Sequence, residues 1–153
     1  MKIYIATDHA GYEMKEAIAS YVEKELGYTV ADMGAHQNDP DDDFSDFIQL
    51  AAGEVSHDPN GSKGIVLGGS GQGEAMVANR FPNVRCTTYY GGSLDIIKLS
   101  RDHNNANMLS LGARFMTLAE AKAAVKLWLE VPFSEDDRHV RRIKKLEKIW
   151  PYR

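Results

Sequence analysis

Short apolar runs of the β type alternate with helical patterns along this chain of 153 residues. In the helical patterns, apolar residues recur three or four positions apart, as they do on one face of a helix. Such alternation is typical of βαβ units, and therefore of a parallel, doubly wound sheet with helices on both faces. The apolar runs predict five strands, over residues 2–7, 29–32, 64–68, 85–88 and 108–111. The helical patterns cover residues 11–26, 44–57, 71–79, 93–101, 117–130 and 134–150. We therefore expect one Rossmann-like α/β domain over residues 1–153, with about five parallel strands and an additional C-terminal helix.

The composition narrows the possible classes of function. A net charge of −4 argues against a general affinity for nucleic acid. The one cysteine, Cys86, excludes an internal disulfide framework, and we interpret it as a small buried hydrophobe in mid-strand. No apolar run is long enough to span a membrane, and Asp8-His9 interrupts the first run, unlike in a signal peptide. We expect a cytoplasmic protein that binds neither nucleic acid nor membrane.

A glycine-rich segment, Gly68-Gly69-Ser70-Gly71-Gln72-Gly73-Glu74, lies between the third predicted strand and the next helix. Glycines let backbone N–H groups approach an anion closely, and a helix start adds further donors. The segment lacks the Lys-Ser/Thr ending of a P-loop and the spacing and position of a dinucleotide fingerprint. The alternative is a tight strand-to-helix turn, for which one or two glycines would suffice. Four glycines with Ser70 and Glu74 favour a ligand loop for an anion, or for an oxygen that becomes anionic.

Further polar residues lie beside the predicted strands, where ligands bind in this class of fold. Each also has a purely structural explanation. Asp8 could cap the first helix, Glu74 could simply stabilise its helix start, and His103 could belong to a helix C-cap. The functional candidates are Asp8, His9, Asp43, the glycine segment, His103, Asn104 and Arg114.

The first turns of the predicted last helix carry the basic residues Arg138, His139, Arg141 and Arg142. Basic residues oppose the helix dipole at an N-terminus, so their placement favours an anionic partner. Guanidinium groups suit phosphate in particular, because their fork of donors matches its oxygens. The alternative is ion pairing with the acidic residues 135–137.

Taken together, these residues resemble the ribose-5-phosphate isomerase B / galactose-6-phosphate isomerase (RpiB/LacAB) family over almost the whole chain. The matching motifs are Thr7-Asp8-His9-Ala10-Gly11, residues 68–74, Ala78-Asn79-Arg80, residues 100–107 (SRDHNNAN), Leu111-Gly112-Ala113-Arg114 and residues 138–142 (RHVRR). Any one of these motifs is weak evidence, but their order and spacing are specific.

The resemblance implies interconversion of an aldose phosphate and a ketose phosphate through a cis-enediolate, with no metal and no cofactor. It also implies a homodimer or homotetramer whose active sites are each built from two subunits. In this chain, the catalytic roles implied are ring opening by His103 and Asp8, and proton movement between oxygens by Ser70. The resemblance also implies three binding roles. The loop amides of Gly69, Gly71 and Gly73 hold the enediolate, and Asn104 and Asp43 bind the sugar. The phosphate is bound by His9, Arg114, Arg138 and Arg142.

Two departures from the family pattern bear on mechanism and substrate. Many members carry a cysteine as the base at the position of Gly68, whereas another branch uses a glutamate just after the loop, which Glu74 matches. We expect Glu74 to be the base, shielded from water and kept ionised by the loop amides. Phe44 stands where the family usually has a tyrosine, and residues 89–92 form a slightly longer segment.

The expected reaction is the isomerisation of ribose 5-phosphate to ribulose 5-phosphate. The alternatives are an isomerase of a six-carbon sugar phosphate, such as allose or galactose 6-phosphate, or a non-catalytic flavodoxin-like module that binds a phosphorylated ligand.

Overall fold

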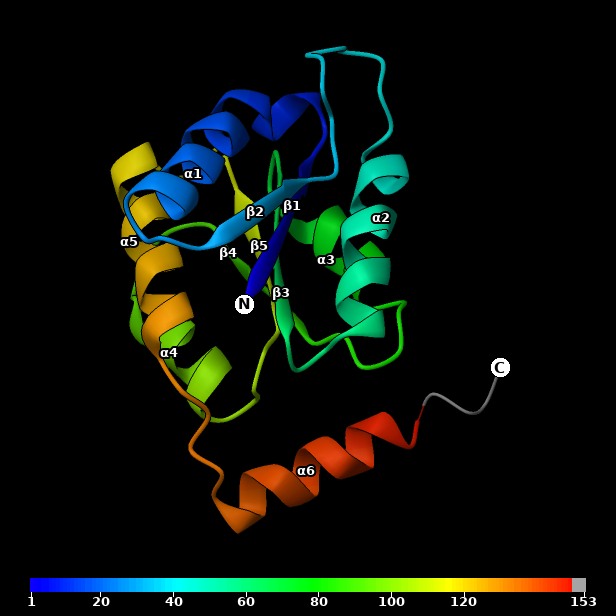
Figure 1. The fold of residues 1–153 in the computed structure, drawn as a ribbon, viewed down its shortest axis with the longest axis vertical. Helices are drawn as coiled ribbons and strands as arrows, with labels where there is room; N and C mark the ends of the chain where they lie inside the picture. Colours follow the sequence, from blue (N-terminus) through cyan, green and yellow to red (C-terminus); the bar gives the residue numbers. More distant parts are fainter. Residues whose placement is uncertain (150–153) are drawn as a thin grey trace.

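The fold is a single five-stranded sheet with helices on both of its faces (Figure 1). The computed structural model describes residues 1–149. The strands are β1 (Lys2–Thr7), β2 (Thr29–Asp32), β3 (Ser62–Gly68), β4 (Cys86–Tyr89) and β5 (Met108–Gly112). All neighbouring strands are parallel, in the order β2-β1-β3-β5-β4. The expected α/β class and the five parallel strands are confirmed.

Two layers of helices cover the sheet. The helices are α1 (Tyr12–Lys24), α2 (Phe44–His57), α3 (Gln72–Ala78), α4 (Asp95–Asp102), α5 (Leu118–Glu130) and α6 (Asp137–Glu147), with a 3-10 turn, η1, at His9–Gly11. Helix α5 packs between α1 and α4 on one face, while α2 and α3 pack together on the other. Among residues 1–149, no helix has both the length and the apolar composition needed to cross a membrane.

Each face of the sheet has its own apolar core. Because side chains alternate along a strand, Ile5 and Leu67 face α1 and α5, whereas Ala6 and Val66 face α2. Trp128 of α5 is completely buried in the first core. The strands are apolar on both faces, as expected for a parallel sheet covered on two sides. This rigid sheet fixes the positions of the loops at its two edges.

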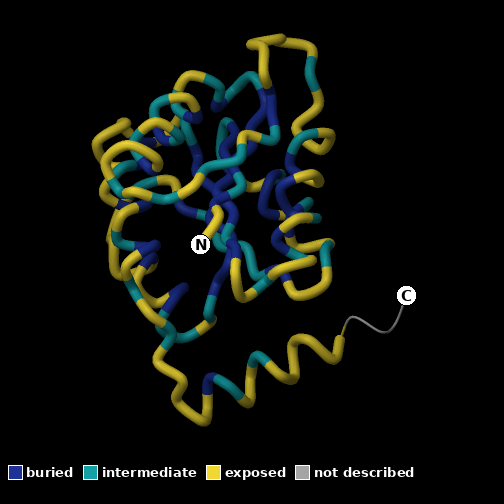
Figure 2. The backbone as a smooth tube through the Cα atoms, in the orientation of Figure 1, coloured by how far each residue is buried: buried dark blue, intermediate teal, exposed yellow. Residues whose placement is uncertain are grey.

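Helix α6 lies outside the two helix layers, and most of its residues are exposed, with His139 as the buried exception (Figures 1 and 2). It begins at Asp137, three residues later than the sequence predicted. The reason is local: Ser134 Oγ lies 2.9 Å from His139 Nδ1 and accepts from the Asp136 backbone N–H, which holds the preceding residues outside the helix. The predicted end of this helix, at Trp150 and Pro151, lies outside the described residues.

Strand β4 also differs from the prediction, because it begins at Cys86 and not at Arg85. The Arg85 N–H donates to the Asn107 side chain at 2.8 Å, outside the ladder of strand hydrogen bonds. Cys86 is therefore the first residue of its strand and half-buried, not a fully buried residue in mid-strand. The Asn79 side chain fixes its backbone by two hydrogen bonds, of 2.9 and 3.0 Å.

Candidate active site

The carboxyl ends of β1, β3 and β5 are neighbours in the sheet and bring three functional segments together. The strand order reverses between β1 and β3, because the chain adds β2 on one side of β1 and β3 on the other, and ligands bind at this switch point in open α/β folds. Asp8-His9 follows β1, the glycine loop follows β3, and Arg114 follows β5. The Arg114 N–H donates to Gly69 O at 3.1 Å, so the last two segments are tied together. The structure therefore unites these predicted site residues at one edge of the sheet.

The glycine loop, Gly69 to Gly73, turns sharply and leaves backbone donors free. Gly71 has a φ of +75°, and a Cβ there would approach the Gly112 backbone N to 3.1 Å, so a side chain fits neither the conformation nor the space. The Ser110 hydroxyl donates to Gly71 O at 2.6 Å and holds the turn. Within residues 1–149, the N–H groups of Gly69, Ser70 and Gly71 have no hydrogen-bond acceptor. They are available to an anionic oxygen, which is the role that the sequence predicts for this loop.

The Glu74 side chain folds back against the end of β3. The residue is 4% exposed, so the predicted shielding from water is confirmed. A Cβ at Gly68 would overlap the Glu74 carboxylate, which therefore occupies the space that a side chain at position 68 would need. Burial raises the pKa of Glu74 and outweighs the opposing effect of its own backbone N–H, while the nearby charge of Asp8 raises it further. A backbone amide does favour the ionised form, as the sequence predicts, but desolvation is the larger effect.

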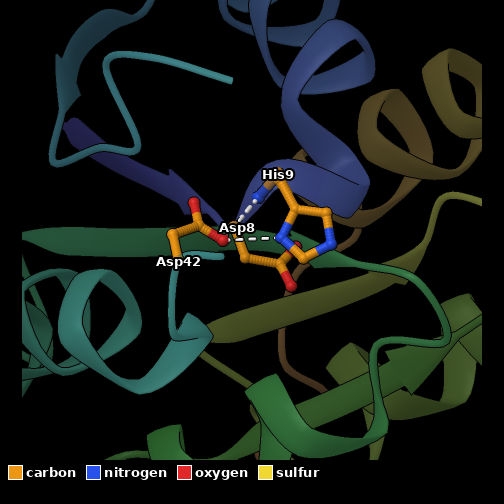
Figure 3. A group of neighbouring side chains, drawn as sticks. All are labelled: Asp8, His9 and Asp42. Atoms are coloured by element: carbon orange, nitrogen blue, oxygen red, sulfur yellow. Dashed lines mark hydrogen bonds and ion pairs between the residues drawn. The ribbon is translucent and has the colours of Figure 1, made fainter. Parts of the chain in front are cut away.

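Asp8, His9 and Asp42 form a close group at the end of β1 (Figure 3). Asp8 accepts from the Ala10 N–H at 3.0 Å and so caps η1, which is the structural role foreseen as its alternative. Asp42 Oδ1 lies 2.6 Å from His9 Nδ1 and also accepts from the His9 N–H at 3.1 Å. The hydrogen bond to Asp42 raises the pKa of His9 against the effect of burial, so its charged form is favoured.

Asp42 is a site residue that the sequence reasoning missed. The candidate in this loop was Asp43, which is exposed and stands at the N-cap of α2 without a capping hydrogen bond. Both belong to a run of three aspartates, and the run itself gives no signal of which one turns inward. Phe44 packs its ring against Gly73, where a Cβ would lie 2.9 Å from Phe44 Cζ.

His103 and Asn104 lie at the opposite edge of the sheet. The sequence predicts that they follow a helix and precede the fifth strand, and they do lie between α4 and β5. In a parallel sheet this places them at the amino edge, away from the glycine loop of the same chain. The His103 residue is the C-cap of α4, its Nε2 lies 3.6 Å from Asp102 Oδ2, and its ring lies 4.3 Å from that of His139.

Helix α6 carries its basic residues to this second group. His139 is 2% exposed, and burial, followed by the proximity of His103, lowers its pKa. Arg142 is exposed and lines a cavity of about 420 Å³ together with His103 and Asn104. Arg138 Nε lies 3.8 Å from Asp136 Oδ2, a weak surface pair of the kind foreseen as the alternative to phosphate binding. His9 and Arg114 line a different cavity, of about 600 Å³.

The arrangement at the carboxyl edge of this α/β fold resembles an enzyme active site, because free loop amides and basic residues there can bind an anion beside a buried carboxylate. The group around His103 lies at the opposite edge.

Residues 3–146 match the family described as ribose/galactose isomerase. The chain is 44% identical to the ribose-5-phosphate isomerase B of Mycobacterium tuberculosis, over 94% of this chain and 86% of the relative. It is similar to the crystal structure of ribose-5-phosphate isomerase B from Mycoplasma genitalium with bound ribulose-5-phosphate, with a TM-score of 0.93 and 33% identity over 99% and 97% of the two chains. A Clostridium thermocellum ribose-5-phosphate isomerase B gives a TM-score of 0.89 at 37% identity, over 97% of each chain. The chain therefore belongs to the ribose/galactose isomerase family, a family of sugar isomerases.

Proposed function

We propose that the protein interconverts ribose 5-phosphate and ribulose 5-phosphate through a cis-enediolate, with Glu74 as the base that removes the C2 proton. The observation that carries the proposal is the buried Glu74 carboxylate beside the three unoccupied loop amides. A base shielded from water next to preorganised donors is what proton abstraction beside a carbonyl requires. The ribulose-5-phosphate bound in the Mycoplasma genitalium structure and the name of the Mycobacterium tuberculosis relative support the choice of substrate.

In the proposed reaction the protein's own groups move every proton. Asp8 and His103 assist ring opening, Glu74 takes the C2 proton, and the amides of Gly69 to Gly73 stabilise the negative oxygen that forms. Ser70 moves a proton between the two oxygens, and Glu74 returns its proton to C1. Asn104 and Asp43 contact the sugar hydroxyls. His9, Arg114, Arg138 and Arg142 bind the phosphate, which keeps the reacting carbons at a fixed distance from the base.

We assign the chain to the glutamate-base branch of its family on two observations. The Glu74 carboxylate fills the space beside Gly68, the position at which many members carry a cysteine. A cysteine side chain at position 68 would overlap Glu74 where it now lies, so the chain has room for only one of the two bases. The one cysteine of the chain, Cys86, is poorly suited to replace it, because burial raises the pKa of its thiol and disfavours the thiolate.

We further propose that the active site is shared between two copies of the chain, in a homodimer or homotetramer acting in the cytoplasm. Asp8, His9 and the glycine loop lie at one edge of the sheet, whereas His103 and Asn104 lie at the other. A site that uses both groups therefore needs the second group from a neighbouring subunit. Exposed α6, which packs loosely on its own chain, suits an element that contacts a partner.

The shared site can be tested by mixing two inactive proteins. Glu74→Gln and His103→Ala subunits, unfolded together and refolded, should form mixed dimers in which one site has both groups intact. Activity that neither variant shows alone supports the shared site. A mixture that stays inactive although mixed dimers are present contradicts it.

The reaction itself is tested by assaying purified protein for conversion of ribose 5-phosphate to ribulose 5-phosphate, with a chelator present and Glu74→Gln alongside. We expect turnover that survives the chelator and falls roughly 10²–10⁴-fold in the variant, as is typical for loss of a general base. Turnover of allose or galactose 6-phosphate in place of ribose 5-phosphate would favour the six-carbon alternative. Binding of sugar phosphates without any turnover would favour the non-catalytic module.

A further inference from the structure

Asp42 makes two hydrogen bonds to the same residue, and both use the same oxygen. Its Oδ1 accepts from the His9 backbone N–H at 3.1 Å and lies 2.6 Å from His9 Nδ1 (Figure 3). The two bonds fix the backbone and the ring of His9 at once. With Nδ1 engaged by Asp42, Nε2 is the one ring nitrogen left to meet a ligand.

The second oxygen of the Asp42 carboxylate, Oδ2, does not help to hold the described part of the fold together. Its side chain is 8% exposed, and Oδ2 is buried without any hydrogen-bond partner within residues 1–149. Burying a carboxylate oxygen that is not hydrogen-bonded destabilises a fold. The burial of Asp42 therefore costs stability, and the contacts that its carboxylate does make all hold His9 in place.

The charges around His9 determine how strongly Asp42 affects it. Asp8 from the end of β1 favours the imidazolium, Arg114 from the end of β5 disfavours it, and the hydrogen bond to Asp42 is the largest influence and favours it. Glu13 of α1 also lines the cavity that His9 and Arg114 share. A cationic ring with a free Nε2–H beside a guanidinium group is suited to two oxygens of one phosphate.

We propose that Asp42 is a positioning residue of the phosphate pocket, which holds the His9 ring in one orientation so that Nε2 donates to the phosphate of the substrate. This inference rests on the proposed function, because it takes His9 as a phosphate ligand. Asp42 touches neither the reacting carbons nor the phosphate in this arrangement, and acts through His9.

The test is Asp42→Asn, which keeps the shape of the side chain and removes its charge, with Asp41→Asn as the matched control. Asp41 is the neighbouring carboxylate and is exposed. In Asp42→Asn we expect KM for ribose 5-phosphate to rise roughly tenfold at pH 8, the factor typical of losing a hydrogen bond to a charged group. The increase should shrink as the pH is lowered, because a lower pH itself favours the imidazolium, and kcat should change little. Asp41→Asn should match the wild type at every pH.

A double-mutant cycle separates positioning from a general effect on the loop. If Asp42 acts through His9, Asp42→Asn should raise KM in the wild type but not in a His9→Gln background. A KM–pH profile of Asp42→Asn that superimposes on the wild type refutes the proposal. So does an equal increase of KM in both backgrounds.

A spectroscopic measurement keeps this inference distinct from the proposed function. The ring nitrogens of His9 are titrated by NMR in ¹⁵N-labelled wild type and Asp42→Asn, with and without inorganic phosphate. We expect His9 to titrate at a lower pH in the variant, and phosphate to shift the His9 signals at lower concentration in the wild type. An inactive wild type that still shows both differences refutes the isomerase and retains the role of Asp42. Identical His9 titrations in the two proteins refute the role of Asp42, whatever the activity.

Discussion

The substitution Gly68→Ala tests whether the space beside β3 belongs to the catalytic carboxylate. A methyl group at this position would overlap Glu74 Oε1 and Cδ and would lie 2.6 Å from Oε2. Gly68 is not among the glycines with a positive φ, so its backbone accepts alanine without strain. Its three nearest neighbours all belong to the Glu74 carboxylate, and the effect of the methyl group must therefore pass through that side chain.

The size of the effect follows from how far the carboxylate must move. Ordinary van der Waals contact begins at 3.4 Å, so even Oε2, the most distant of the three atoms, must retreat from 2.6 Å to that distance. A displacement of about 1 Å in a reacting group can reduce the rate about 10²-fold, and complete loss of a general base costs roughly 10²–10⁴-fold. We expect kcat to fall within this range while KM changes little, because the phosphate ligands are untouched. Overpacking of a buried site should also lower the free energy of unfolding by about 1–3 kcal/mol.

The assay compares kcat and unfolding in Gly68→Ala, Glu74→Ala and the double variant. Because Glu74→Ala leaves room for the methyl group, Gly68→Ala should destabilise the Glu74→Ala protein much less than the wild type. Gly53→Ala is the control: it lies in α2, and the nearest atom to a Cβ there is 3.8 Å away. A Gly68→Ala enzyme with wild-type kcat would refute the reasoning, since either Glu74 is not the base or its position is unimportant.

Two further predictions concern pH and the loop that carries Asp42. Since burial raises the pKa of Glu74 and the base must be ionised, the acid limb of the kcat/KM profile should lie above pH 4.5, the ordinary glutamate value; a limb at or below pH 4.5 would contradict this. Lys15 is fully buried, and its Nζ donates to Asp32 Oδ2 at 2.6 Å and to Ala35 O at 2.9 Å, just before the loop. Lys15→Met should lower the free energy of unfolding by about 3 kcal/mol in urea titrations, the lower end for a broken buried ion pair, because Asp32 is partly exposed. Lys24→Met, at an exposed site on the same helix, should change it by less than about 0.5 kcal/mol, and equal effects of the two would refute the role of Lys15.

The secondary structure was predictable because its signals are local. Apolar runs and helical spacing gave the strands and helices of the sheet, and the Thr117–Glu120 capping box forms as its residue types predicted. One boundary error has a distant cause, because Asn107 shifts the start of β4. The other has a local cause, because the contact of Ser134 with His139, five residues further on, delays the start of α6. Neither contact has a signal in the residues nearest to it in the chain.

The candidate site was predictable in part, for the same reason. The glycine segment could be recognised from its residue types alone, and the carboxylate of Glu74 that follows it is buried, as expected. The choice between Asp42 and Asp43 depended on the direction in which a loop turns, which a run of aspartates does not reveal. The placing of His103 depended on which edge of the sheet a residue between α4 and β5 reaches.

The sequence by itself determined the α/β class, the order of strands and helices along the chain, and the residue types that can bind an anion and move a proton. These depend on periodicity and on side-chain chemistry, which are properties of neighbouring residues. Only the tertiary structure decided which strands lie side by side, that Glu74 folds into the space at Gly68, and that His9 and His103 lie at opposite edges of one sheet. Each of these depends on packing between segments that are distant in the chain, because the sheet buries both of its faces against helices. The same burial removes water from the site and so shifts the pKa values of its groups.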